Sequence, residues 1–393
     1  MSANGRSAQP SVTPAVESAG FVRLVTSADG DGLAASGLLA RALAVGGTPF
    51  QVTVGSTIAA RTDRAQAASA DDELTLAIGA VDADVPRLDG SDRPATLVAL
   101  EIARALGATP DPVLALAGLV AAGVTPGAGE SEWLLEAAED RKLVDRRPGV
   151  AVPTADVADG LAHSTRVDGP WSGDVDAVGD ALEELGIESS GDHSDGDHRA
   201  IASLVALEVV GTEDATTHAA SAIARMLKPY ETPEGHFETV GGYADVLEAA
   251  ARVEPGTAVA LAMGHDAREP ALTAWRRHGR RAHEALESAS TGRYDGLFVL
   301  GFEDGPVETV ARLAAEFRSP EPAVLAIGSG ETALVTRDGI SASMVERIAR
   351  ELESAEEISP ESIEYDAGRN RGYLRYEPTL EEDTIIERVR AVL

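Results

Sequence analysis

The segment FVRLVTSADGDGLAASGLLARALAVGG, residues 21–47, decides the fold class. Residues 21–26 form a short apolar run typical of a buried strand, SADGDG predicts a turn, and residues 33–47 predict a helix that ends in glycines. Two further strands and four helices are predicted downstream, with strands at 49–54 and 74–79 and helices at about 56–68, 93–106, 112–122 and 130–143. Strands that alternate with helices indicate βαβ units and a doubly wound, mostly parallel sheet.

A second, smaller and mixed α/β unit is predicted after residues 228–235. Its expected elements are a strand at 257–263, a long helix at 269–289, a strand at 294–302, a helix at 306–317 and a hairpin closed by the turn around Gly328–Gly330. The sequence therefore predicts two α/β domains with a cleft between them. The expected divisions are a flexible tail (1–20), an N-terminal domain (21–150), a helical linker region (151–235) and a C-terminal domain (236–393).

The charge balance of the chain is strongly acidic. It carries 65 acidic and 33 basic residues, a formal net charge of −32, and only Lys142 and Lys228 of the basic residues are lysines. This composition is typical of a halophilic protein, because in molar salt a Debye length of roughly 3 Å screens the self-repulsion. An acidic disordered chain is the alternative, but a hydrophobic content of 44% in long periodic segments favours a folded protein.

Cysteine and long apolar runs are both absent from the sequence. Without cysteine, disulfides, thiol catalysis and cysteine-based zinc sites are excluded. No apolar run reaches the length of a membrane helix, and the N-terminus has no hydrophobic signal core. We therefore expect a soluble protein of the cytoplasm that has no membrane partner.

Asp29 and Asp31 follow the first predicted strand, at the edge of the sheet where open α/β proteins hold their ligands. Two carboxylates two residues apart, fixed by Gly30 and Gly32, can hold Mg²⁺ or Mn²⁺ and present the ion to a phosphate. They would repel a phosphate bound directly at the helix N-terminus, so a plain phosphate-binding loop is a poor interpretation. The structural alternative is an aspartate N-cap followed by a glycine turn.

The stretch SADGDGLAASGLLARAL, residues 27–43, resembles the first motif of the RecJ-like branch of the DHH phosphoesterases. That motif reads roughly H-x-D-x-D-G, followed by small and aliphatic helix positions. Asp29, Asp31 and Gly32 match it, and Ser27 stands where the family has its first histidine. The resemblance implies a DHH-like N-terminal domain, a substrate-binding C-terminal domain and metal-dependent cleavage of phosphodiesters.

Other parts of the chain are similar to the same family but lack its metal ligands. Segments 115–123, 160–165 and 171–174 resemble RecJ-like chains, with Ala122 at the place of a late metal-binding aspartate. No histidine precedes His163, so the Asp-His-His motif of the family cannot exist in the N-terminal domain. Asp82 and Asp84, after the third predicted strand, are the carboxylates available for the second motif.

The number of expected ligands is small for a hydrolytic centre. Such a centre holds two ions about 3.5–4 Å apart with several ligands. Asp29 and Asp31 with Asp82 or Asp84 could hold one Mg²⁺ or Mn²⁺ loosely, and hardly two. We therefore expect a degraded nuclease site, with Asp29 and Asp31 as the catalytic ligands if activity survives.

A glycine-containing stretch near the C-terminus stands where the family binds its substrate. In YDAGRNRGY, residues 365–373, no histidine is present, but Gly368 and Gly372 would let the backbone approach a phosphate. Arg369 and Arg371, together with the following Arg375, would pair with it. The alternative is a turn between two strands that carries solvated arginines.

A basic run on the predicted helix 269–289 stands out in so acidic a chain. Arginines at positions i and i+4 of a helix share a face and could contact a nucleic-acid backbone, with Trp275 as a stacking platform. The alternative is a basic face paired with neighbouring carboxylates, with Trp275 in the core. The arginines concerned are Arg276, Arg277, Arg280 and Arg281.

Three functions follow from these patterns. The first is a nucleic-acid-associated RecJ-like protein of DNA replication or repair, with a degraded nuclease site, that acts on single strands (DNA rather than RNA) as a binding or scaffold component. By analogy with a silent RecJ relative in the eukaryotic replicative helicase, its partners would be replication proteins such as GINS. The second is an active Mg/Mn-dependent single-strand exonuclease or phosphoesterase. The third is a protein-interaction module without nucleic acid, which predicts that the arginines at 276–281 are paired and buried.

Overall fold

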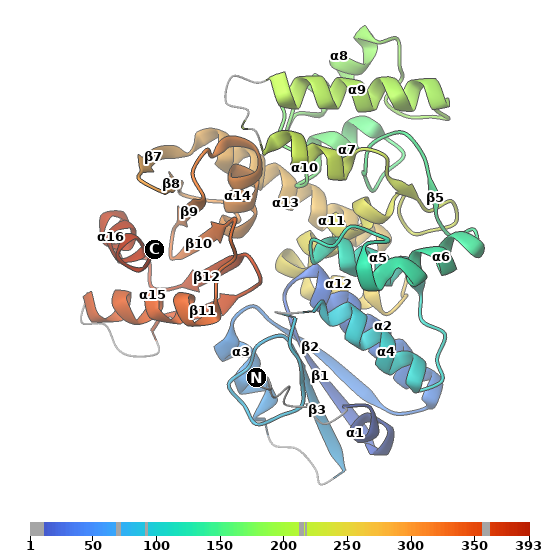
Figure 1. Cartoon of the computed structure of the whole chain (residues 1–393), viewed down its shortest axis with the longest axis vertical. Coiled ribbons are helices and arrows are strands. Elements are labelled where there is room, and N and C mark those ends of the chain that lie inside the picture. Colours follow the sequence, from blue (N-terminus) through green and yellow to red (C-terminus); the bar gives the residue numbers. More distant parts are fainter. Residues whose placement is uncertain (1–11, 68–71, 91–92, 212–215, 217, 356–361) are drawn as a thin grey trace, which may run out of the picture.

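The computed structural model describes the chain except residues 1–11, 68–71, 91–92, 212–215, 217 and 356–361 (Figure 1). The N-terminal elements are α1 (Val12–Ser18), β1 (Phe21–Ser27), α2 (Gly30–Gly46), β2 (Phe50–Gly55), α3 (Ile58–Ala65), β3 (Glu73–Ile78), β4 (Arg87–Leu88), α4 (Ala95–Ala105), α5 (Pro112–Ala121) and α6 (Glu132–Asp140). The middle elements are β5 (Asp145–Arg146), α7 (Val157–His163), α8 (Val175–Glu184), α9 (Asp195–Gly211), α10 (Ala219–Met226) and β6 (Tyr230–Glu231).

The remaining elements form a group of three helices and a sheet that has helices of its own. The helices are α11 (Val240–Val253), α12 (Pro255–Ala262) and α13 (Arg268–Ser288). The sheet and its helices are β7 (Ser290–Tyr294), β8 (Leu297–Gly301), α14 (Val307–Leu313), β9 (Ala323–Gly328), β10 (Glu331–Thr336), α15 (Ala342–Ala355), β11 (Glu364–Ala367), β12 (Arg371–Arg375) and α16 (Glu382–Val392).

The N-terminal sheet is parallel, with the strand order β2-β1-β3-β4. Leu24 at its centre lies in register with Val52 on one side and Leu76 on the other, and is fully buried. The chain leaves β1 toward β2 and later returns past it to β3. Right-handed crossovers then place α2 and α3 on opposite faces of the sheet. The switch point lies at the carboxyl end of β1, which is where an open α/β sheet places its ligand site.

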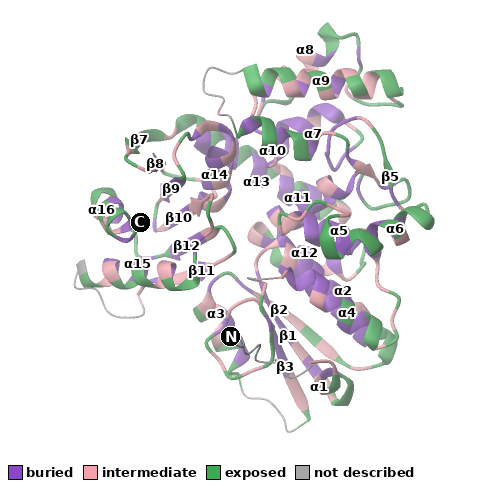
Figure 2. Cartoon of the chain, in the orientation of Figure 1, coloured by how far each residue is buried: buried purple, intermediate pink, exposed green. Residues whose placement is uncertain are grey.

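Helix α2 is enclosed on nearly all sides up to Leu43, and its last turn is exposed (Figure 2). Asp29 caps its N-terminus by accepting a hydrogen bond from the backbone N–H of Gly32, and Gly47 ends it with a left-handed backbone (φ 74°). The helix packs on β1 and on α4, α5, α11 and α12. A helix surrounded in this way needs small and aliphatic residues all round, which the sequence of α2 provides.

Helices α11 and α12 pack against α2, and α11 also packs against α5, so both adjoin the N-terminal part of the chain. Helix α13 packs on α11 and α12 and also contacts α7 and α14. Tyr243, Leu247 and Trp275 join Leu114 and Leu116 of α5 in one apolar core. Trp275 is fully buried there. The alternative that placed this indole in the core is confirmed, and the indole does not offer a stacking surface to a ligand.

The prediction of a strand at 257–263 is wrong. Residues 257–262 lie in helix α12, which begins at Pro255 and contains Ala258, Ala260 and Ala262, and Met263 is its C-cap. Proline is favoured at the first helical position, and alanine has the highest helix propensity. A short apolar run does not distinguish a strand from a buried helix by periodicity, and here the flanking proline was the informative residue.

The C-terminal sheet has six strands in the order β11-β12-β10-β9-β8-β7. Only β8 and β9 are parallel, joined through α14, while all other neighbours are antiparallel. The predicted hairpin around Gly328–Gly330 is confirmed as β9 and β10. A parallel N-terminal sheet followed by a mixed C-terminal sheet confirms the predicted fold class.

The predicted domain boundaries stay predictions. The predicted tail, residues 1–20, lies partly outside the described residues, and within it Val12–Ser18 form α1. Within the predicted linker region, the described residues include the helices α7, α8, α9 and α10. Across the described ranges, every helix is too short or too polar to cross a lipid bilayer.

Candidate site at the Asp29–Gly32 loop

The DGDG loop, as residues 29–32 are called here, comprises the N-cap Asp29 and the first turn of α2, and it is held from two directions. Asp29 accepts a hydrogen bond of 2.8 Å from the N–H of Gly32, and its other carboxylate oxygen lies 3.2 Å from Nη2 of Arg371 on β12. The N–H of Gly30 donates to Glu248 of α11 at 2.7 Å. Burial, with a smaller contribution from Glu248, raises the pKa of Asp29 above its ordinary value.

Both glycines of the loop are required by close packing. A Cβ atom at Gly30 would lie 2.6 Å from Cβ of Ala121, and one at Gly32 would lie 2.4 Å from Oγ of Ser27. Neither separation is possible for real atoms without movement of the neighbour. The DGDG sequence therefore fits a loop pressed against β1 and α5.

Asp31 is the N-terminal cap of a helix distant in sequence. Its two carboxylate oxygens accept hydrogen bonds from the N–H groups of Ala95 (2.8 Å) and Thr96 (2.9 Å), and its carbonyl accepts from the Thr96 hydroxyl. Pro94 occupies the local cap position of α4 and provides no side-chain acceptor. Burial and the neighbouring Asp29 raise the pKa of Asp31 to about 6, against the lowering effect of these hydrogen bonds.

Arg371 lies among carboxylates from three parts of the chain. Besides Asp29, its guanidinium contacts Glu308 of α14 and lies 3.9 Å from Asp366 of β11. Arg252 of α11 extends the network, because it contacts Glu308 and also pairs with Glu248 at 2.6 Å. The loop after β1 is thus connected by ion pairs to α11, α14 and β12.

A second arginine fastens the C-terminal sheet to the N-terminal one. Arg61 of α3 is almost fully buried and pairs with Asp366 at 2.5 Å. Its remaining N–H groups donate to the carbonyls of Gly55 and Ala80, each at 2.9 Å. Burial raises the pKa of Asp366, and Arg61 opposes that rise.

The residues at this loop do not fit the metal centre that the family resemblance implies. Asp31 has both oxygens turned to α4, and Asp29 is shared between Gly32 and Arg371. Asp82 and Asp84 are exposed on the segment after β3. Across the described ranges, no group of three or more histidine or acidic side chains is arranged to hold a metal ion.

The arginines of α13 are largely paired. Arg276 makes two hydrogen bonds to Asp159, at 2.8 and 3.0 Å, while Arg277 and Arg281 pair with Glu254 and Asp304. Arg280 is exposed, and no side-chain partner for it is found among the described residues. Arg277 and Arg281 stay about half exposed despite their partners.

The glycines near the C-terminus lie in and beside the hairpin of β11 and β12. Gly368 forms the turn and donates to the carbonyl of Arg371 at 2.8 Å. A Cβ atom at Gly372 would lie 2.6 Å from a methyl group of Val345, so this glycine serves packing against α15. Arg369 is exposed at the turn, whereas Arg371 points into the carboxylate network.

Five charged residues of the network were not identified from the sequence. They are Arg61, Glu248, Arg252, Glu308 and Asp366. The i,i+4 spacing of the pair on α11 was a visible signal, but such pairs are common on helix surfaces. No pattern in the sequence around Arg61, Glu308 or Asp366 indicates that the elements that carry them lie close together.

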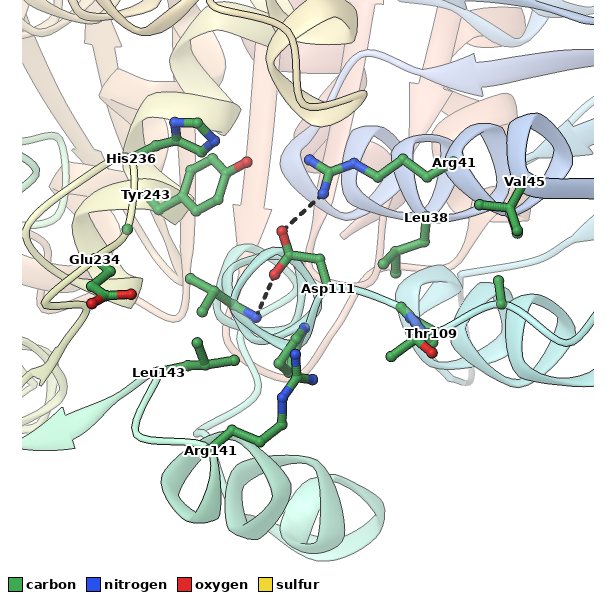
Figure 3. Close-up of a pocket in the computed structure, with 16 residues that line it drawn as sticks. Leu38, Arg41, Val45, Thr109, Asp111, Arg141, Leu143, Glu234, His236 and Tyr243 are labelled. Atoms are coloured by element: carbon green, nitrogen blue, oxygen red, sulfur yellow. Dashed lines mark hydrogen bonds and ion pairs between the residues drawn. The ribbon is translucent and has the colours of Figure 1, made fainter.

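A separate cavity of about 390 Å³ lies along α2, away from Asp29 (Figure 3). Arg41 and Asp111 pair at 2.9 Å in its wall, and the Tyr243 hydroxyl points toward them. That hydroxyl is buried and has no hydrogen-bond partner among the described residues. Leu38, Val45 and Leu143 contribute apolar walls.

Comparison with known proteins gives a family and a fold. Residues 289–391 match the family described as uncharacterized protein rrnAC1427, C-terminal domain. The chain is 48% identical over 347 residues to the uncharacterized protein rrnAC1427 of Haloarcula marismortui, which covers 86% of this chain and 88% of that protein.

Among solved structures, CDC45 from Entamoeba histolytica has a TM-score of 0.62 at 9% identity, covering 97% of this chain and 96% of CDC45. Exonuclease RecJ bound to manganese has a TM-score of 0.48 at 15% identity, covering 97% and 94%. RecJ with Mn²⁺ from Thermus thermophilus has a TM-score of 0.49 at 17% identity, covering 97% and 53%. At sequence identities of 9–17%, these similarities show a shared fold and do not show a shared function. The chain belongs to the family of the protein rrnAC1427, and its α/β architecture is similar to that of CDC45.

Proposed function

We propose that this chain is a nucleic-acid-associated protein of DNA replication or repair that does not cleave its nucleic acid and acts as a single-strand-binding or scaffold component. One observation carries the proposal: both carboxylates of the DGDG loop are engaged by the chain's own donors. A hydrolytic centre needs carboxylates directed at two ions about 3.5–4 Å apart. Here Asp31 stabilises the start of α4 and Asp29 pairs with an arginine.

The link to replication is an analogy with CDC45 and rests on fold similarity. Exposed guanidinium groups at Arg280 and Arg369 supply cations for a phosphate backbone in an otherwise acidic chain. The role proposed includes protein partners of the replication machinery, such as GINS. A cytoplasmic location and adaptation to molar salt belong to the same proposal, supported by the haloarchaeal relative.

The experiment measures cleavage and binding together, in molar KCl with Mn²⁺, on end-labelled single-stranded DNA and RNA. We expect binding of single-stranded DNA by the wild type without cleavage. Asp29→Asn is the control for contaminating nuclease, because it removes one of the two carboxylates of the loop and leaves Asp31, the cap of α4, in place. Cleavage by the wild type that Asp29→Asn abolishes would overturn the proposal in favour of an active nuclease.

A protein-interaction module without nucleic acid is the second candidate. Ion pairing of Arg276, Arg277 and Arg281 favours it, because paired arginines contribute less to a backbone contact. It predicts that the wild type neither cleaves nor binds single-stranded DNA or RNA at any salt concentration at which the protein is folded. The same assay therefore separates all three functions.

A further inference from the structure

The carboxylate of Glu316 is shared by two arginines from different helices. Glu316 lies in a π-helical turn, Ala314–Arg318, that continues α14 and packs against α10. One of its oxygens pairs with Arg225 of α10 at 2.7 Å, and the other lies 3.9 Å from Arg312 of α14. Single π-helical turns are frequent at functional sites. The exposed fractions of these three side chains are 28% to 45%, so a ligand can reach them.

Arg312 is also tied to the segment that follows α7. Its Nη2 donates to the hydroxyl of Thr165 at 3.0 Å, and that hydroxyl donates to Asp245 at 2.5 Å. Both oxygens of Asp245 accept from donors on α13 and on this segment. The residue after Thr165 is Arg166, so its side chain begins beside a carboxylate that other donors already occupy.

Arg166 is a guanidinium without a carboxylate of its own. It is partly buried, and it has neither an ion pair nor a side-chain hydrogen bond among the described residues. Burial lowers the pKa of Arg166, and the positive charges of Arg312 and Arg225 lower it further, while Asp245 and Glu316 oppose the change. In a chain with 65 acidic and 33 basic residues, such an arginine is unexpected. A partly buried charge is costly without a partner, and repulsion by like charges adds to that cost.

The three arginines come from three elements and outnumber the anions available to them. Arg225 lies on α10, Arg312 on α14 and Arg166 after α7. Glu316 is divided between two of them, and Asp245 is engaged by other donors. An anion that accepts from three guanidinium groups at once needs more than the two oxygens of a carboxylate. A phosphate group has enough acceptor oxygens, and the guanidinium fork matches its geometry.

We propose that Arg166, Arg225 and Arg312 form a binding site for one phosphate group, and that Glu316 competes with this phosphate for Arg225 and Arg312. The inference rests on the proposed function, because it names the part of a single strand that the site holds, a phosphate of the backbone. Inorganic phosphate presents the same chemistry, so the two sources are measured separately.

The first measurement is fluorescence anisotropy of a labelled oligothymidylate without terminal phosphates, over a series of KCl concentrations at which the protein is folded. The second is equilibrium dialysis with radiolabelled inorganic phosphate. Arg166→Gln removes the unpaired cation, and Glu316→Gln removes the competing anion. The matched controls are Arg350→Gln and Glu346→Gln, which change an i,i+4 pair on α15. This helix packs on the face of the C-terminal sheet opposite to α14.

We expect Arg166→Gln to raise the Kd for the oligonucleotide at least about threefold and to reduce the slope of log K against log salt concentration by about 0.7, the value for one phosphate contact. Glu316→Gln should lower the same Kd at least about threefold relative to Glu346→Gln. Arg350→Gln should leave it unchanged. The Tm of Arg166→Gln should stay within about 2 °C of the wild type, because no carboxylate loses its partner.

Three results would overturn the inference and leave the proposed function intact: oligonucleotide binding that Arg166→Gln does not weaken, binding that Glu316→Gln does not strengthen, or a Tm loss above about 5 °C in Arg166→Gln, which would make this arginine structural. If Arg166 is needed for the oligonucleotide alone, the backbone is the source of the phosphate. If the wild type binds inorganic phosphate through Arg166 but no oligonucleotide, the site stands and the proposed function fails. Binding of neither probe would overturn both.

Discussion

The indole Nε1 of Trp275 donates a 3.0 Å hydrogen bond to Oδ2 of Asp245, and both side chains are buried. Asp245 also accepts from the hydroxyl of Ser164 (3.0 Å) and from the N–H and hydroxyl of Thr165 (3.1 and 2.5 Å). A single carboxylate on α11 therefore holds both α13 and the segment that follows α7. The basic run and the segment that resembled RecJ-like chains meet at this one residue.

Asp245→Ala should lower the free energy of unfolding by about 3 kcal/mol, because four donors would lose their acceptor inside the protein. Urea unfolding in molar KCl measures the change. Asp266→Ala, at an exposed position, should change the same quantity by no more than about 0.5 kcal/mol. A loss below about 1 kcal/mol for Asp245→Ala would show that water or neighbouring groups replace the carboxylate.

His278 should make stability depend on pH. Its ring contacts the Thr309 hydroxyl at 2.9 Å, and burial, with a further contribution from Arg252, lowers its pKa from 6.5 to about 3. Other charges that act on it are Glu248 of α11, Arg312 of α14 and Arg281 of its own helix. The folded protein therefore keeps this imidazole neutral at a pH where the unfolded chain protonates it.

Between about pH 6.5 and about pH 3 the unfolded state binds one more proton at this position, so stability falls as the pH drops, by up to about 1.4 kcal/mol per pH unit. Asp31 contributes with the opposite sign, because its pKa of about 6 lies above its ordinary value. The difference between the wild type and His278→Gln cancels that contribution. Parallel stability–pH curves for the two proteins would contradict the assignment to His278.

Features of the fold that depend on neighbouring residues, such as single strands, helices and turns, could be predicted from the sequence. The strand–turn–helix at 21–47, the parallel sheet and the hairpin at Gly328–Gly330 were each predicted from neighbouring residues and are confirmed. Helix α12 was missed because the periodicity of a short apolar run does not distinguish a strand from a buried helix.

The site could be predicted only in part. Asp29 was identified because a motif marks it, and Arg371 because it follows a glycine turn. That the two lie 3.2 Å apart could not be foreseen, since 342 positions separate them in sequence. Asp31 caps α4 because Pro94, at the local cap position, has no side-chain acceptor. No pattern in either segment of the sequence indicates that the two segments are in contact. Contacts of this kind are fixed by the packing of whole domains.

Tyr243→Phe should raise the free energy of unfolding by about 1 kcal/mol. The buried hydroxyl has no hydrogen-bond partner among the described residues, so the cost of removing it from water is not offset. Burial and the charge of Asp111 raise the pKa of this hydroxyl, so it stays protonated. Tyr376→Phe is the matched control: its hydroxyl donates to the carbonyl of Glu331 at 3.2 Å, and its loss should destabilise by a similar amount. Equal destabilisation by both changes would mean that a molecule in the cavity beside Arg41 binds the Tyr243 hydroxyl.

Arg280 and Arg276 lie one helical turn apart on α13 and should behave differently toward nucleic acid. Arg276 is held by two hydrogen bonds to Asp159, whereas Arg280 is exposed and has no partner among the described residues. If α13 contacts a single strand, Arg280→Ala should reduce the slope of log K against log salt concentration by about 0.7, the value for one phosphate contact. Arg276→Ala should lower Tm and leave that slope unchanged. Fluorescence anisotropy with labelled single-stranded DNA measures the slope for each protein. Equal slopes for the wild type and Arg280→Ala would show that α13 is not part of the binding surface.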